Sequence, residues 1–274
     1  MKCEKKLLKI LCLHGYRQSG DIFKQKLGGF RKALKRHAEL IFITAPNQLP
    51  PAEEASESEQ YGWWFSTENL TFDSKVPSDL SLGFQKSLEL IEKTFQEQGP
   101  FDGILGFSQG AAFVGILCGM QEHHMLKYEF RFAILVAGFK SLCMPHMNYY
   151  LKVCSLPSLH VYGETDQIIT RERSELLQEQ FEDPDVIIHP GRHFVPASNT
   201  EKQGYILFLE QIMKEIQDEE EIKKKQIQIG SFVLERVDDS ESDEGNDKRA
   251  RENGSSSAKH KKTRRRLSST RVSK

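Results

Sequence analysis

Short apolar segments recur along the first 216 residues, separated by polar turns and by stretches with helical periodicity. The segment at 7–13 is dense in Leu, Ile and Cys without alternation, as expected of a strand buried on both faces. The predicted strands cover residues 7–13, 39–44, 101–105, 132–137, 159–162 and 186–189. Apolar positions at helical spacing predict helices from about residue 21, over 79–98, after 110, over 171–181 and over 199–216.

This alternation of strands and helices predicts an α/β fold with a doubly wound, mainly parallel sheet of about six strands. Ligands of such sheets bind at the carboxyl ends of the strands, near a switch in strand order. Several residues of chemical interest lie just past predicted strand ends, and we expect them to gather at that edge. They are His14, Ser108, Phe139, Asp166 and His193.

Composition divides the 274 residues into three parts. Residues 1–217 carry the apolar segments and are predicted to form one α/β domain that holds the candidate catalytic residues. The hydrophobic content of 38% is low for a wholly globular chain, and the deficit lies after Ile216. Residues 218–237 are predicted to extend the last helix or to form a linker. Residues 238–274 are acidic and then basic, so a disordered tail is predicted.

Net charge and the cysteines indicate which partners and which compartment to expect. The formal net charge of −1 argues against a stable nucleic-acid complex. Five cysteines without a C-x-x-C pattern are typical of a reducing compartment such as the cytoplasm. His123 and His124 are adjacent and do not face one metal ion, and we predict neither a metal site nor a cofactor. No apolar stretch has the length of a membrane span.

Residues 106–110, Gly-Phe-Ser-Gln-Gly, fit the pattern G-x-S-x-G between an apolar strand and a helix of small and apolar residues. A serine on such a turn is held out of the end of the sheet, so its hydroxyl group faces a substrate. A side chain at Gly106 or Gly110 would collide with neighbouring backbone. A tight strand–helix connection is the alternative interpretation, but the flanking strand and helix favour a nucleophile at Ser108.

A serine hydroxyl group is a weak nucleophile near neutral pH. It needs an imidazole to accept its proton and an acid to orient that imidazole. Asp166 and His193 follow Ser108 in the order typical of the α/β-hydrolase arrangement. Glu164 is a rival for the acid, and a helix N-cap is the other interpretation of Asp166. His189 is a rival for the base, although we expect it to lie within a strand.

An acyl-transfer intermediate also needs two preorganised donors for its oxyanion. The backbone N–H of Gln109, at the start of a helix, is the first candidate. The second is the backbone N–H of Tyr16, in the loop after the first strand, where Gly15 lets the backbone approach closely. An ordinary strand-ending turn is the alternative interpretation of His14 and Gly15.

Both tryptophans, Trp63 and Trp64, follow a Pro-, Glu- and Ser-rich loop at 48–60. Core packing and a cleft wall explain them equally well. We expect some apolar residues near the strand ends to line an acyl pocket, with Trp64 and Phe194 as first candidates. The whole set is Trp63, Trp64, Phe107, Phe139, Phe194 and Val195.

Five ordered segments together resemble the FSH family of small serine hydrolases. They are LCLHGYRQSG (11–20), GWWF (62–65), FDGILGFSQG (101–110), VYGETD (161–166) and GRHFVP (191–196). The resemblance covers about residues 7–216. It implies an α/β-hydrolase fold and a carboxylesterase that prefers fatty-acyl esters, with Ser108 as nucleophile, Asp166 as acid and His193 as base. Arg192 departs from the family pattern, which often has a second glycine before the histidine.

The first functional hypothesis is therefore a serine esterase or acyl-thioesterase that forms an acyl-enzyme on Ser108 with a small-molecule acyl ester. The second is a ligand-binding protein on a hydrolase scaffold with little turnover, because fold and function separate readily. Basic clusters at 248–249 and 259–266 indicate either a signal read by a nuclear import receptor or a solubilising tail. The predicted location of the protein is therefore the cytoplasm, with the nucleus as the alternative.

Overall fold

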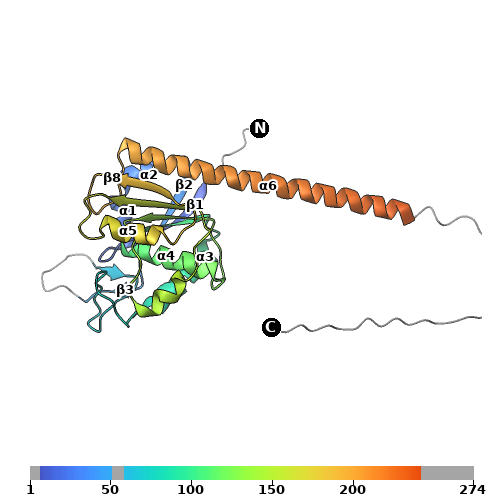
Figure 1. Cartoon of the computed structure of the whole chain (residues 1–274). Coiled ribbons are helices and arrows are strands. Elements are labelled where there is room, and N and C mark those ends of the chain that lie inside the picture. The colour runs from blue at the N-terminus through green and yellow to red at the C-terminus, as the bar shows by residue number, and fades with distance from the viewer. Residues whose placement is uncertain (1–6, 51–58, 242–274) are drawn as a thin grey trace, which may run out of the picture. The chain divides into compact units, whose positions relative to one another are not determined.

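The computed structural model describes residues 7–50 and 59–241, with side chains described as far as residue 227. Its centre is a six-stranded sheet in the order β2-β1-β5-β6-β7-β8 (Figure 1). Every neighbouring pair of strands is parallel, which confirms the predicted fold class. The strands are β1 (Leu8–Leu13), β2 (Ala38–Ile43), β5 (Gly103–Phe107), β6 (Phe132–Val136), β7 (Ser158–Gly163) and β8 (Asp185–His189).

Helices cover both faces of the sheet, and each face has its own apolar core. One core joins α3, α4 and α5 to the sheet, and the other joins α1, α2 and α6 to it. β1 contributes Leu11 to the first core and Cys12 to the second, because successive side chains of a strand point to opposite faces. The helices are α1 (Gly20–Lys26), α2 (Gly28–Leu34), α3 (Phe84–Gln98), α4 (Gln109–Glu122), α5 (Arg171–Gln178) and α6 (Asn199–Glu241).

The strand order switches direction between β1 and β5. The chain passes from β1 to β2 at one edge of the sheet and later adds β5 on the other side of β1. Leu13 pairs with Gly106 in this register, so the loops after β1 and β5 start side by side. Parallel sheets bind ligands at such a switch. β8 forms the far edge of the sheet and leaves Val186 and Ile188 exposed.

Three further short elements lie outside the main sheet in the described part of the chain. β3 (Asn47–Gln48) pairs antiparallel with β4 (Tyr61–Gly62), on either side of the predicted polar loop. The segment after β6, which is irregular in the sequence, contains a 3₁₀ helix, η1 (Met144–Tyr150).

Four helices differ from their predicted bounds. The helix expected over 171–181 ends at Gln178. The helix expected from residue 79 begins at Phe84, because Gly83 has a left-handed backbone (φ 80°) that an α-helix does not include. The helix expected from residue 21 is divided into α1 and α2 at Leu27. α6 continues past residue 216 to Glu241, and it includes residues 238–241 of the predicted tail. Such an extension is supported by ion pairs one turn apart, like that between Lys225 and Glu221 (2.8 Å).

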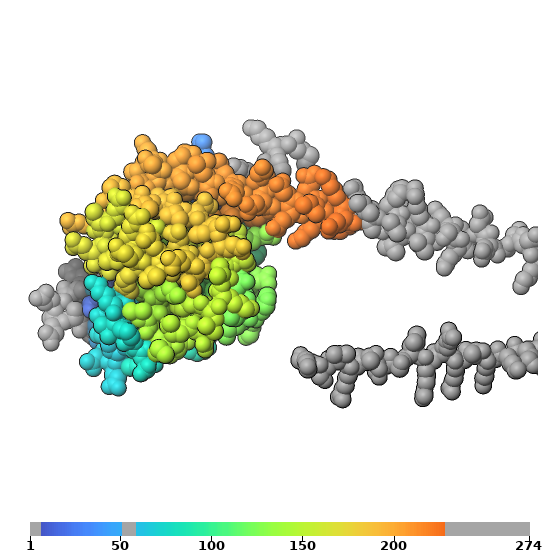
Figure 2. Space-filling model, viewed as in Figure 1, coloured from blue at the N-terminus to red at the C-terminus, as the bar shows by residue number. Residues whose placement is uncertain are grey.

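The chain divides by its contacts into residues 1–219 and 220–274. The sheet, both cores and the candidate site residues belong to the first unit. Its surface, seen from the side of Figure 1, is formed mostly by segments coloured green to gold (Figure 2). Residues 242–274, the rest of the predicted tail, lie outside the described part of the chain. No described helix combines the length and apolar character needed to cross a membrane.

Candidate active site

Ser108 lies on the sharp turn between β5 and α4. Its backbone has φ 54° and ψ −117°, a strained conformation for a residue with a side chain. The turn is tight because both flanking glycines are in close contact. A Cβ at Gly106 would lie 2.5 Å from the backbone of Gly110, and a Cβ at Gly110 would lie 2.4 Å from the carbonyl oxygen of Leu13. The collision expected from the sequence is therefore present at both positions.

His193, in the loop after β8, joins Ser108 to Asp166. Its Nε2 lies 3.0 Å from Ser108 Oγ, and its Nδ1 lies 2.7 Å from Asp166 Oδ2. A carboxylate only accepts hydrogen bonds, so the Nδ1–H donates to Asp166 and Nε2 is left to accept the serine proton. The structure thus brings together the three residues that the sequence singled out.

Asp166 is held as an anion in the turn after β7. Its side chain is fully buried, and burial by itself raises the pKa of a carboxyl group. The hydrogen bond and charge of His193, together with the N–H groups of Ile169 and Ile168, outweigh burial and lower the pKa of Asp166. Asp166 is therefore available to orient an imidazole and to stabilise its protonated form.

The rival acid and base lie elsewhere. Glu164 is exposed. His189 is the last residue of β8 and is buried, with its ring 5.0 Å from that of Phe194. Burial lowers the pKa of His189. The position within a strand, expected from the sequence, explains why this histidine packs sideways while His193 reaches the serine.

The loop after β1 lies directly against the nucleophile turn. A Cβ on Gly15 would be 3.0 Å from the ring of Phe107 and 3.4 Å from Ser108 Cβ, so only a glycine allows this approach without displacement. Gln109 is the first residue of α4, so its N–H has no acceptor within the helix. The two loops that carry the candidate oxyanion donors, Tyr16 and Gln109, are therefore neighbours.

A buried hydrogen-bond network ties these loops together, and sequence reasoning missed it. The side chain of Gln109 accepts from the N–H of Trp63 (2.9 Å) and donates to the carbonyl of Trp64 (2.8 Å). The indole N–H of Trp63 donates to the carbonyl of His14 (2.8 Å). His14 Nε2 accepts from the N–H of Ala45 (2.9 Å). The only sequence signal for this network is the placement of Gln109 and His14 beside the two motif loops.

His14 is a structural histidine in this network. Because its Nε2 accepts a hydrogen bond, the proton is on Nδ1, which donates to the carbonyl of Gly15 (2.8 Å). Burial lowers the pKa of His14 to about 4, although the bond to Gly15 acts in the opposite direction. The ring is therefore neutral near pH 7.

A cavity of about 540 Å³ opens beside His193. It contains three of the six predicted pocket residues. It also contains four residues between 18 and 27 to which no role was assigned from the sequence. The full lining is Gln18, Phe23, Lys26, Leu27, Phe107, His193, Phe194 and Val195.

The other three predicted pocket residues lie in the core. Trp63 and Trp64 have no exposed surface, and Phe139 is 1% exposed. The ring of Phe113 from α4 packs against both tryptophans, at centroid distances of 5.3 and 6.4 Å. These residues pack in the core and do not line the cavity beside His193. Of the two interpretations of the tryptophans, core packing is therefore the one that the structure shows.

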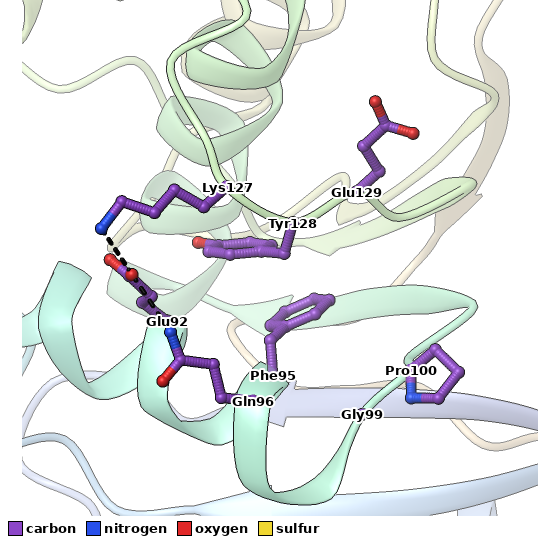
Figure 3. A pocket seen from close by; sticks show the side chains of 8 residues that line it. All are labelled: Glu92, Phe95, Gln96, Gly99, Pro100, Lys127, Tyr128 and Glu129. Atoms are coloured by element: carbon purple, nitrogen blue, oxygen red, sulfur yellow. Dashed lines mark hydrogen bonds and ion pairs between the residues drawn. The ribbon is translucent and has the colours of Figure 1, made fainter.

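Figure 3 shows the residues that line a second cavity, of about 430 Å³. Its residues come from the end of α3 and from the segments that precede β5 and β6, whereas Ser108 follows β5. Tyr128 stacks on Phe95 (4.0 Å between ring centroids), and Lys127 pairs with Glu92 at 2.8 Å. Because parallel strands start at one edge of a sheet and end at the other, this cavity lies at the edge opposite the serine. Within the described residues, no three His, Cys, Asp or Glu side chains are grouped as metal ligands.

Comparison with known proteins agrees with this geometry. The family model described as serine hydrolase (FSH1) matches residues 1–205. Esterase OVCA2 of Danio rerio is 44% identical over 218 residues, which cover 74% of this chain and 96% of that protein. Esterase CG5412 of Drosophila melanogaster is 42% identical over 219 residues, which cover 79% of this chain and 78% of that protein.

Solved structures share the fold at much lower identity. Acyl-protein thioesterase 2 of Zea mays has a TM-score of 0.52 at 15% identity, with 75% of this chain and 95% of that one covered. Esterase PE8 has the same TM-score at 17% identity, with 77% and 96% covered. The sheet is thus that of an α/β-hydrolase. With the family model over residues 1–205 and esterases at 42–44% identity, the chain belongs to the serine hydrolase (FSH1) family and is a serine hydrolase of the esterase kind.

Proposed function

We propose that the protein is a carboxylesterase that cleaves fatty-acyl esters through a covalent acyl-enzyme on Ser108. The observation that carries the proposal is the continuous hydrogen-bonded chain from Ser108 through His193 to Asp166, at 3.0 and 2.7 Å. Ser108 is the nucleophile, His193 the base and Asp166 the acid that orients it.

In the first half of the reaction, His193 Nε2 accepts the proton of Ser108 as Oγ bonds to the acyl carbon. The backbone N–H groups of Gln109 and Tyr16 bind the oxyanion that forms, aided by the positive end of the α4 dipole. His193 then donates its proton to the alcohol oxygen as the ester bond breaks. In the second half, a water molecule gives a proton to His193 and its oxygen bonds to the acyl carbon. His193 then returns the proton to Ser108 Oγ as the bond between Oγ and the acyl carbon breaks, which releases the acid and restores Ser108.

The apolar part of the cavity beside His193 supports an acyl or alkyl chain as the bound group. Phe107, Phe194 and Val195 line it, and half-exposed Phe194 (47%) leaves an apolar wall facing solvent. A thioester would react through the same residues, so the leaving atom distinguishes an esterase from a thioesterase. A ligand-binding protein would hold the ester without turnover.

The test is labelling by a fluorophosphonate together with turnover of a matched ester and thioester. We expect Ser108→Ala to abolish both labelling and hydrolysis while the circular dichroism spectrum is unchanged. Ser81→Ala is the matched control, because Ser81 Oγ also lies close to a histidine, 2.6 Å from His146 Nε2, but has no place on the nucleophile turn. Near wild-type turnover in Ser108→Ala would overturn the proposal.

We also propose that the basic clusters at 248–249 and 259–266 act as a nuclear import signal. These residues lie outside the described part of the chain, and their sequence alone supports the proposal. Residues 238–274 fused to a large fluorescent cargo are expected to carry it into the nucleus. Ser268→Asp is expected to weaken this, because negative charge beside the cluster opposes recognition by an acidic receptor surface. Cargo that stays in the cytoplasm would contradict the idea.

A further inference from the structure

The cavity beside His193 has a polar side as well as an apolar one. Five of its residues are Phe, Leu or Val, but Gln18 and Lys26 from the β1–α1 segment also line it. An esterase that bound a plain hydrocarbon chain would need neither of these side chains. Their positions therefore bear on which chemical groups the substrate carries.

Gln18 lines this cavity with a polar side chain. Its backbone is fixed on both sides, because its N–H donates to the carbonyl of Gly15 (3.3 Å) and its carbonyl accepts from the N–H of Tyr61 (3.1 Å). Its side-chain Oε1 is buried, yet no described group donates a hydrogen bond to it. Because Oε1 is closed off from solvent and only accepts hydrogen bonds, it does not bind an anion. The side-chain N–H₂ group of Gln18 is the donor, and it is the part of this amide that can donate to a carboxylate or phosphate oxygen.

Lys26 brings a positive charge to the same cavity. It is exposed on the last turn of α1, and none of the recorded ion pairs between described side chains involves it. None of the eight lining residues is acidic. Apolar walls next to a cation concentrate its field, which favours an anion in the cavity. Lys24 shares the last turn of α1 but does not line the cavity.

We propose that the preferred substrate is an ester whose chain carries an anionic group, a carboxylate or a phosphate. Lys26 binds the anion, and the side-chain N–H₂ group of Gln18 donates a hydrogen bond to one of its oxygen atoms. The inference rests on the proposed esterase function, since the cavity is a substrate site only if His193 acts on the ester. The inference predicts that an ester with an anionic group is a better substrate than a neutral ester of the same chain length.

The experiment compares matched esters on the full chain. In the acyl arm, the p-nitrophenyl monoester of adipic acid is compared with p-nitrophenyl hexanoate. In the alcohol arm, the butyrate ester of 6-hydroxyhexanoate is compared with hexyl butyrate. The readout is the ratio of kcat/KM for the anionic ester to that for the neutral one. We expect Lys26→Gln to lower this ratio about two- to fivefold in one arm, as for a solvent-accessible ion pair.

Lys24→Gln removes the same charge from the same helix and is expected to leave the ratio unchanged. Lys26→Arg is expected to retain the ratio, which separates charge from a packing effect. Added NaCl should lower the ratio in the unmodified protein and have little effect on it in Lys26→Gln. Gln18→Leu should raise the KM of the anionic ester more than that of the neutral one.

The arm in which the ratio falls shows whether the acyl or the alcohol part of the ester occupies the cavity, and either result supports the proposal. If Lys26→Gln leaves the ratio unchanged in both arms while neutral esters are still hydrolysed, the proposal of an anionic substrate is overturned and the proposed esterase function is unaffected. If the unmodified protein hydrolyses none of the four esters and is not labelled by a fluorophosphonate, the esterase function fails, and this inference fails with it.

Discussion

Acidification should destabilise this protein strongly between pH 7 and pH 5, because burial lowers the pKa of four described histidines, His189 among them. Three of the four have shifts large enough to give a magnitude. Burial lowers the pKa of His14 to about 4, of His146 to about 4 and of His160 to about 3, from an ordinary value of 6.5. The unfolded chain therefore binds more protons than the folded one below pH 6.5. Stability is lost as the pH falls from about 6.5 towards the folded-state values.

The size of the effect follows from these pKa values. A tenfold difference in proton affinity is about 1.4 kcal/mol, so each histidine removes about 2 kcal/mol of stability between pH 7 and pH 5. The three together remove about 6 kcal/mol, which is comparable with the whole stability of many domains. The lowered pKa of Asp166 acts at lower pH and adds little in this interval.

His160→Leu tests the reasoning at one position. His160 is buried in β7 beside the ring of Phe181 (4.8 Å between centroids), and its Nε2 has no described hydrogen-bond partner. Leucine removes the titrating group without leaving a polar atom unpaired. We expect the loss of stability between pH 7 and pH 5 to be about 2 kcal/mol smaller in the variant.

The assay is urea unfolding followed by fluorescence of the two buried tryptophans at pH 7 and pH 5. Phe181→Leu is the control, since it disturbs the same contact and titrates nothing, and its destabilisation should be the same at both pH values. If His160→Leu loses as much stability on acidification as the unmodified protein does, the burial argument is refuted.

Three further outcomes follow from the site and the chain's organisation. His193→Ala should lower kcat by about four orders of magnitude or more, whereas His189→Ala should retain the chemistry; full activity in the first together with loss in the second would reverse the assignment of the base. For neutral esters, kcat/KM should rise with acyl length by up to about fourfold per buried methylene, from ~0.8 kcal/mol each, and a flat profile from acetyl to decanoyl would exclude an acyl pocket. Truncation after Val237 should leave esterase activity unchanged, and lost activity would mean that the tail supports the domain.

Much of the fold was predictable because its signals are periodic and local. Apolar runs separated by helical patterns specify a parallel sheet, and such a sheet gathers the residues after its strands at one edge. That rule is why Ser108, Asp166 and His193 lie together although 85 residues separate the first from the last. The glycine spacing also predicted the close contact on both sides of Ser108.

The walls of the site were less predictable, for a physical reason. An aromatic residue after a strand has the same sequence pattern whether it faces a cavity or the core, so Trp64 and Phe194 were indistinguishable. Trp64 is buried because Phe113 of α4 packs against it, as it does against Trp63, whereas Phe194 is 47% exposed. Lys26 ends a short helix without a motif, and the 11–20 segment that contains Gln18 gave that residue no role. Only the folded chain shows that both line the cavity beside His193.

The position of β8 has a consequence for how the enzyme loses activity. β8 has a neighbour on one side only, and His193 follows it directly. Edge strands have fewer partners to hold them, so they open at lower free energy than central ones. Ser108 and its glycine turn follow β5 in the middle of the sheet, whereas His193 follows the edge strand β8. Partial opening at that edge would separate His193 Nε2 from Ser108 Oγ while the interior remained folded. If His193 is the base, we therefore expect activity to be lost before the protein unfolds.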